Sequence, residues 1–182
     1  MADIERIKQQ LKPYPRDYCL FVVGINTGFR GGELLSLTCG QVATLCPGDH
    51  LEIWQSKTGK MRGVTVNKPA AKALKRWYTT HPSPSAAAPL FVSRTGRVLT
   101  GSTLCNMVKK WCEDAGLVGQ YSSHTLRKTW GYQALRRSRG VSKYMILPIL
   151  MQAYGHATQD QTLQYLCVQS DEIANLFMTV EI

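Results

Sequence analysis

The chain has 182 residues, 44% of them hydrophobic, which is enough for one core of ordinary size and predicts a single domain over residues 1–182. Lys and Arg total 22 against 12 Asp and Glu, and the formal net charge of +10 favours a polyanionic partner. No run approaches the roughly 18 apolar residues that span a bilayer, and residues 1–17 hold no secretory signal core. We therefore expect a soluble cytoplasmic protein rather than a membrane or secreted one.

Two helices are expected near the start of the chain. Residues 17–29 form an apolar run long enough for a buried helix, and residues 30–37 (RGGELLSL) restart helical spacing. Arg30 lies at the junction, ahead of two glycines, where backbone can approach a ligand closely. A structural ion pair between Arg30 and Glu33 is the plainer interpretation.

A β-hairpin is expected next. Residues 51–56 (LEIWQS) alternate apolar and polar side chains, residues 57–62 (KTGKMR) supply a turn that contains glycine, and residues 63–67 (GVTVN) alternate again. Lys57 lies where the first strand enters the turn. A solvated surface lysine is the default interpretation of such a position.

The rest of the chain is predicted to be mostly helical. Residues 69–79 begin with Pro69, which suits a first helical position, and residues 81–89 (HPSPSAAAP) are typical of a surface loop. A short strand is expected at 90–93. Further helices are predicted at 100–116, capped by Thr100 or Ser102, and at 124–138, 143–153, 158–166 and 171–178. The predicted fold class is α+β, a mostly helical domain with one small antiparallel sheet.

Cysteine usage indicates a reducing compartment. No two cysteines form a CxxC pair, and each has apolar or mixed neighbours that suit a small buried side chain. We expect reduced, buried thiols at Cys19, Cys39, Cys46, Cys105, Cys112 and Cys167. No group of His, Cys, Asp and Glu has metal-ligand spacing, so neither a metal nor a cofactor is expected.

Four polar side chains in the second half could form a site. His124 and Arg127 are three residues apart and would share one helix face, although such pairs are often idle. Gly155 and His156 could close a helix. Tyr165, nine residues after His156, could be a core residue with a wet hydroxyl.

Taken in order, these segments resemble the tyrosine recombinases, or phage-type integrases, over residues 17–170. TGFRGGELLSL is similar to the family's first arginine motif, QSKTGK to its hairpin lysine motif, SHTLRKTWGY to its HxxR motif and YGHATQDQTLQYL to its closing motif. Each motif is weak alone, but together they are specific because all occur in the family's order. The matching catalytic positions are Arg30, Lys57, His124, Arg127, His156 and Tyr165.

The resemblance implies attack by Tyr165 on a DNA phosphodiester. Arg30 and Arg127 would bind phosphate oxygens bidentately and stabilise the negative charge of the transition state without a metal. His156 would donate a hydrogen bond to the same oxygens. The product would be a 3′-phosphotyrosyl link with a free 5′ hydroxyl.

The resemblance also implies the proton transfers. His124 is the candidate base for the tyrosine, and Lys57 could protonate the departing 5′ oxygen as general acid. Lys60 competes with Lys57, and Tyr154 competes with Tyr165; the family spacing favours Lys57 and Tyr165.

The predicted function is that of a site-specific recombinase, the integrase of a phage or other mobile genetic element. Its partners would be double-stranded DNA and further copies of the chain, in a tetramer on paired sites. The N-terminal core-binding domain of this family is expected to be absent. The alternatives are a DNA-binding regulator without cleavage activity and an enzyme that resembles type IB topoisomerases.

Overall fold

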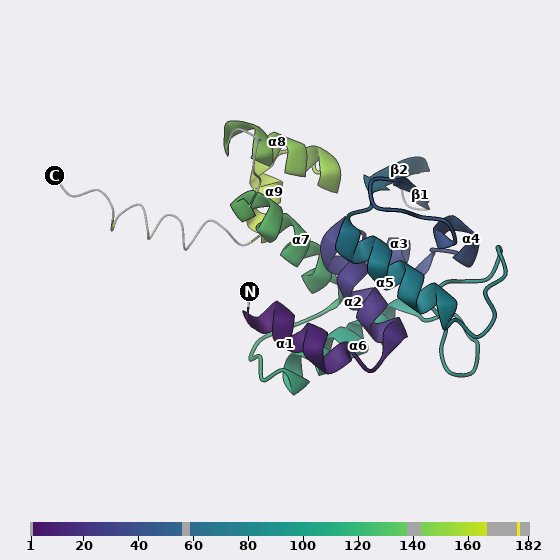
Figure 1. Ribbon diagram of the computed structural model, residues 1–182. Helices are drawn as coiled ribbons and strands as arrows, with labels where there is room; N and C mark the ends of the chain where they lie inside the picture. The colour runs from purple at the N-terminus through teal and green to yellow at the C-terminus, as the bar shows by residue number, and fades with distance from the viewer. Residues whose placement is uncertain (1, 56–58, 138–142, 167–177, 179–182) are drawn as a thin grey trace. The chain divides into compact units, whose positions relative to one another are not determined.

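The computed structural model describes residues 2–55, 59–137, 143–166 and 178 (Figure 1). The chain divides into two compact units, Met1–Arg127 and Lys128–Ile182, and each is described by itself. Whether residues 1–182 act as one domain stays a prediction. Within the described residues, no helix has the length and apolar character needed to cross a membrane.

The first unit is built on helix α2 (Pro15–Thr27), which confirms the buried helix predicted from the apolar run. Pro15 opens the helix, and Gly28 ends it with a φ of 61°, a left-handed conformation that glycine adopts without strain. Helix α1 (Ala2–Leu11) precedes it and was not predicted. Only Ile7 and Leu11 of α1 are buried, four residues apart on one face, which is a weak signal in a polar sequence.

Two further helices complete the core around α2. Helix α5 (Lys68–Thr79) lies along α2, and its Trp77 indole donates a 2.8 Å hydrogen bond to the carbonyl of Leu90. Helix α6 (Gly101–Asp114) is capped by Thr100, whose hydroxyl accepts from the Thr103 amide. The Pro69 prediction is off by one position, because Asn67 caps α5 and leaves Lys68 as its first residue.

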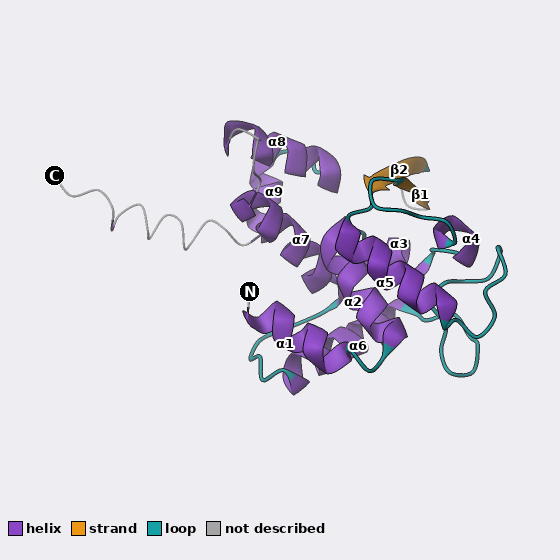
Figure 2. Ribbon diagram, in the orientation of Figure 1, coloured by secondary structure: helices purple, strands orange, loops and turns teal. Residues whose placement is uncertain are grey.

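The only sheet among the described residues is the hairpin of β1 (His50–Gln55) and β2 (Lys60–Thr65), drawn in orange in Figure 2. The antiparallel register pairs Ile53 with Arg62 and Leu51 with Val64. The predicted turn was too long, because pairing with β1 satisfies the backbone of 60–62 and extends β2. The α+β class with a small antiparallel sheet is confirmed.

Residues 90–93 do not form the predicted strand. Val92 makes a single bridge to Val98, and the neighbouring Pro89 bridges Thr38. The apolar residues of this segment are buried all the same, so the apolar run reflected burial rather than membership of a β-ladder. Two short helices line the path from α2 to the hairpin: α3 (Gly31–Leu35) and α4 (Cys39–Val42).

The cysteine prediction needs a correction. The described cysteines are unpaired as expected, but Cys46 is exposed and Cys105 only half-buried. Burial raises the pKa of the Cys112 thiol to about 11, whereas a hydrogen bond to Ser123 lowers the pKa of Cys105. Cys167 lies outside the described residues.

Helix α7 (Ser123–Arg137) begins in the first unit and continues into the second, which also holds α8 (Lys143–Tyr154) and α9 (Gln159–Leu166). These three helices match the predicted ones within a few residues, while the helix predicted at 171–178 lies almost wholly outside the described residues. Tyr154 is 1% exposed and forms the centre of this unit's small core. Its ring meets that of Trp130 edge to face at 5.5 Å.

Gly131 of α7 provides the room for Tyr154. A Cβ at Gly131 would touch the Tyr154 hydroxyl and lie 2.7 Å from its Cζ atom, inside van der Waals contact. We predict that Gly131→Ala lowers the free energy of unfolding by about 1–3 kcal/mol, because the buried ring must shift. Chemical denaturation checks this.

Gly101→Ala is the matched control, because a Cβ there meets nothing within 4 Å. That change in the first turn of α6 should be neutral or stabilise by up to about 1 kcal/mol. Equal effects of the two alanines would contradict the close approach of α7 to Tyr154.

Candidate active site

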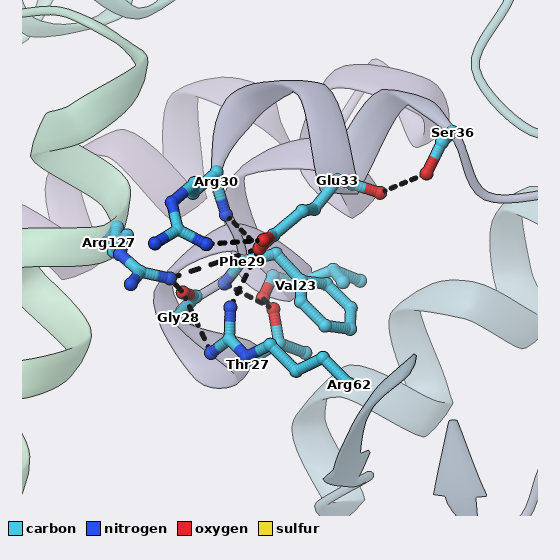
Figure 3. Close-up of polar contacts among 9 residues, drawn as sticks. All are labelled: Val23, Thr27, Gly28, Phe29, Arg30, Glu33, Ser36, Arg62 and Arg127. Atoms are coloured by element: carbon cyan, nitrogen blue, oxygen red, sulfur yellow. Dashed lines mark hydrogen bonds and ion pairs between the residues drawn. The ribbon is translucent and has the colours of Figure 1, made fainter. Parts of the chain in front are cut away.

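A buried carboxylate organises the polar residues at the end of α2 (Figure 3). Glu33 is 7% exposed, and its Oε1 and Oε2 atoms accept hydrogen bonds from Arg30 Nη1 at 2.8 Å and Arg62 Nη1 at 2.7 Å. Arg127 Nη1 lies 3.9 Å from Oε2. Three guanidinium groups therefore surround one carboxylate, which offsets much of their mutual repulsion.

Local sequence explains how Arg30 is held. Arg30 is the N-cap residue of α3, and an arginine has no acceptor with which to cap a helix. Glu33, at the third helical position, completes this end of the helix instead. Its Oε2 atom accepts a 2.7 Å hydrogen bond from the Arg30 amide. The same carboxylate thus fixes both the backbone and the side chain of Arg30. The ion pair considered from the sequence exists, yet the Arg30 side chain stays 36% exposed and reaches solvent.

The first glycine after Arg30 allows close packing. A Cβ at Gly31 would lie 3.0 Å from the Ser123 side chain at the start of α7, and 3.4 Å from Leu104 of α6. A Cβ at Gly32 would meet nothing within 4 Å. Gly31 therefore brings the Arg30 segment against the beginning of the helix that carries the second arginine.

Arg127 is almost wholly buried, with a side chain 3% exposed. Its Nη1 atom donates a 2.6 Å hydrogen bond to the carbonyl of Gly28, which also accepts from Arg62 Nη2 at 3.3 Å. Gly28 follows the C-terminus of α2, the end of a helix dipole that favours cations. The structure thus brings Arg30 and Arg127 together, as the motifs predicted.

Arg62 is the member of this group that sequence reasoning missed. It lies opposite Ile53 in the hairpin, and Ile53 is 1% exposed, so Arg62 occupies an inward-facing position. Its guanidinium also lies 5.4 Å from the centre of the Phe29 ring. An arginine at an inward position of a strand is a signal for a buried acid, and the alternation of the hairpin could have revealed it.

The sequence predicted two further site residues in the first unit, His124 and Lys57. His124 is exposed in the first turn of α7, one turn ahead of Arg127, and its amide donates to Ser122 Oγ at 3.3 Å. Lys57 lies outside the described residues. Its competitor Lys60 is the first residue of β2, where it pairs with Gln55.

In the second unit, a helix end positions His156. The amides of Gly155 and His156 donate to the carbonyls of Gln152 and Met151, at 3.0 Å each, and Gly155 has a φ of 67°. This pattern is a Schellman motif that ends α8, as predicted from the sequence. It directs the imidazole back toward α9, where Nδ1 lies 3.0 Å from the hydroxyl of Thr162.

Tyr165 of α9 has a half-buried ring that contacts two other rings and a cation. The rings of Tyr154 and His156 meet it edge to face at 5.1 and 5.3 Å, and the Lys128 ammonium lies 5.3 Å from its centre. A cation over the ring and two aromatic contacts restrict the orientation of the phenol. The structure therefore brings His156 and Tyr165 together within this unit.

Tyr154 has a different environment from its competitor. It is 1% exposed, its ring stacks on His156 at 5.1 Å, and its hydroxyl lies against Gly131. The phenol ring of Tyr154 therefore packs against the imidazole and has almost no contact with solvent. Tyr165, by contrast, is partly accessible.

Among the residues that the structure describes, no group of three or more His, Cys, Asp or Glu could hold a metal ion. The chemistry of the first unit is that of an anion site, since two arginines are preorganised by one carboxylate and one carbonyl. The chemistry of the second is that of a phenol beside an imidazole.

The sequence model of the Phage integrase family matches residues 2–172 of the chain. The chain is 28% identical over 173 residues to the "Probable integrase/recombinase YoeC" of Bacillus subtilis, which covers 94% of this chain and 88% of that protein. It is 26% identical over 171 residues to the "Tyrosine recombinase XerC" of Alcanivorax borkumensis, covering 89% of this chain and 51% of that protein. The chain thus spans about half the length of this XerC relative.

Solved structures show the same fold. The XerA recombinase matches with a TM-score of 0.77 and 21% identity, over 100% of this chain and 63% of that one. The XerH site-specific recombinase, bound to a palindromic difH substrate after cleavage, matches with a TM-score of 0.75 and 21% identity, over 97% of this chain and 50% of that one.

The geometry around Glu33 generates a stability prediction. We expect Glu33→Gln to lower the free energy of unfolding by about 3–5 kcal/mol, because it removes the negative charge that pairs with Arg62 and lies 3.9 Å from the buried guanidinium of Arg127. Urea denaturation measures it. Glu5→Gln is the control: Glu5 pairs with Lys8 at the surface, so a change of about 0–1 kcal/mol is expected. A mild effect of Glu33→Gln would show that the arginines do not depend on this carboxylate.

Proposed function

The chain belongs to the Phage integrase family, and on that basis we propose that it is a tyrosine-type site-specific recombinase in which Arg30, Arg127, His156 and Tyr165 act on one DNA phosphodiester. The observation that carries the proposal is the pair of arginines held at Glu33 and Gly28. Guanidinium groups fixed before the substrate arrives stabilise a phosphoryl transition state without reorganising.

The two arginines differ in burial, and we propose that they differ in role accordingly. Arg127 is deeply buried and bonded to the Gly28 carbonyl, so its position is fixed by the fold. Arg30 reaches solvent, while Glu33 accepts a hydrogen bond from its amide and forms an ion pair with its side chain. Such an arrangement supports bidentate capture of a phosphate that approaches from solvent.

Tyr165 is the proposed nucleophile. Its half-buried ring beside His156 supports this choice, and the burial of Tyr154 against α7 argues against its competitor. The Lys128 ammonium lies 5.3 Å from the centre of the Tyr165 ring, a cation–π contact that helps to hold the phenol in place.

In the proposed reaction, the Tyr165 oxygen attacks phosphorus, and the bond from phosphorus to the 5′ oxygen breaks. His124 accepts the phenol proton, and Lys57 protonates the departing 5′ oxygen. The 5′ hydroxyl of another strand then attacks the 3′-phosphotyrosine, which restores the phosphodiester and releases Tyr165.

The proposed partners are duplex DNA and further copies of the chain. The net charge of +10 suits phosphate neutralisation. XerH is described in complex with its difH substrate, and lambda integrase as a dimer bound to a COC′ core site. For this chain we propose a tetramer on paired sites, acting in the cytoplasm on the DNA of a phage or other mobile element.

Trapping of a covalent intermediate tests the reaction. We predict that the wild type forms a covalent adduct with a nicked suicide duplex and that Tyr165→Phe forms none, because the bond is to the deleted oxygen. The ring is kept, so the fold should lose at most about 1 kcal/mol. Denaturing electrophoresis detects the adduct.

Tyr154→Phe is the matched control and should still form the adduct. EDTA should not affect the wild type, since the arginines supply the positive charge. An adduct that persists in Tyr165→Phe, or cleavage stopped by EDTA, would refute the mechanism. A DNA-binding regulator would form no adduct, and a topoisomerase-like enzyme would relax supercoiled DNA that lacks a recombination site.

Removal of Arg30 tests the transition-state role. We predict that Arg30→Ala slows adduct formation by about 100- to 1,000-fold, because it removes one preorganised donor, while DNA affinity changes little. Arg127→Ala should be at least as slow, although its burial makes a loss of stability part of that effect.

Arg94→Ala removes the same charge from an exposed position of the first unit and serves as the control. It should cleave at the wild-type rate. Single-turnover kinetics at saturating DNA separates cleavage from binding. The arginine assignment fails if Arg30→Ala and Arg94→Ala cleave alike.

A further inference from the structure

Thr162 of α9 is a buried hydroxyl to which the proposed reaction gives no role. The residue is 0% exposed and lies between His156 and Tyr165 in the sequence. Its Oγ1 atom is 3.0 Å from Nδ1 of His156 and 3.4 Å from the carbonyl oxygen of Thr158. A hydroxyl has one proton, so it can donate to only one of these two acceptors.

The geometry favours donation to the imidazole. A distance of 3.4 Å is longer than an ordinary hydrogen bond between two oxygens, whereas 3.0 Å is ordinary between oxygen and nitrogen. Thr158 also precedes the first residue of α9, and a carbonyl at that position accepts the first bond of the helix. The Thr158 carbonyl therefore has a partner without Thr162.

Donation to Nδ1 determines where the imidazole keeps its own proton. A neutral imidazole that accepts at Nδ1 carries its hydrogen on Nε2. Stacking on Tyr154 at 5.1 Å holds the plane of the ring, and the contact with Thr162 distinguishes the nitrogen from the carbon edge. The opposite nitrogen, Nε2, is then a hydrogen-bond donor in the neutral state.

We infer that Thr162 is a positioning residue that fixes His156 in the tautomer protonated at Nε2, so that neutral His156 donates a hydrogen bond to the phosphate undergoing attack. This inference rests on the proposed function, in which His156 is that donor. With its proton on Nε2, the neutral imidazole can donate this hydrogen bond, so the site does not require an imidazolium. At neutral pH the imidazolium is the minor form of an ordinary histidine.

Nuclear magnetic resonance tests the tautomer without reference to activity. Long-range ¹H–¹⁵N correlation distinguishes the two neutral tautomers, and the His156 signals are those lost in His156→Gln. We expect Nε2–H in the wild type and in Thr162→Ser, which retains the hydroxyl. Thr162→Val has nearly the same shape without the hydroxyl and should show a mixture with Nδ1–H. The same tautomer in Thr162→Val and in the wild type would overturn the inference.

Cleavage of the suicide duplex tests the consequence. Thr162→Val should form the adduct about five- to tenfold more slowly, the scale of one lost hydrogen bond, at unchanged DNA affinity, and Thr162→Ser should restore the rate. In a His156→Gln background, Thr162→Val should cause no further loss, because the two residues act as one unit. An equal loss in both backgrounds would also overturn the inference.

The two proposals can fail separately. A wild type that forms no adduct contradicts the proposed function, while the tautomer spectra still decide what Thr162 does to His156. If the adduct forms and Thr162→Val changes neither the spectrum nor the rate, the proposed function stands and the role of Thr162 fails.

Discussion

The first unit depends on the contacts that Glu33 makes with a group of arginines. Three guanidinium groups lie around this one carboxylate, and three positive charges against one negative leave an excess of two. Without the carboxylate, the buried Arg127 would lose a negative charge that lies 3.9 Å from its guanidinium. With it, part of the repulsion among the three guanidinium groups is offset, and the cluster keeps a positive charge. The segment RGGELL, the end of α2 and the inward face of the hairpin all meet at this point.

A single side chain can do this because it acts on backbone and side chains together. Glu33 completes the N-terminus of α3 through the Arg30 amide and pairs with the guanidinium groups of Arg30 and Arg62. The secondary structure and the anion site are therefore held by the same contacts. A substitution of Glu33 that weakens the N-terminus of α3 therefore also weakens the arginine cluster.

The second unit uses aromatic packing for the same purpose. Tyr154 is buried under Gly131, and the ring of His156 stacks on it, so the imidazole has a firm base. Thr162 meets one imidazole nitrogen from α9, the same helix that carries Tyr165. Packing thus fixes the positions of the two rings, and the buried Thr162 hydroxyl determines which imidazole nitrogen bears the proton. The arginine cluster is organised by charge, and this cluster is organised by shape and a hydrogen bond.

The sequence by itself determined what depends on neighbours along the chain: the helix before Gly28, the hairpin, the Gly155 helix end and the pairing of Arg30 with Glu33. These features rest on periodicity, caps and glycine conformations that act within a few residues. Tertiary structure decided the rest. Arg62 joined the cluster across 29 residues, residues 90–93 were buried without forming a strand, and Tyr154 became a core residue while Tyr165 stayed accessible. The physical reason is that burial and long-range pairing depend on which surfaces meet in the folded chain, and local pattern does not encode that choice.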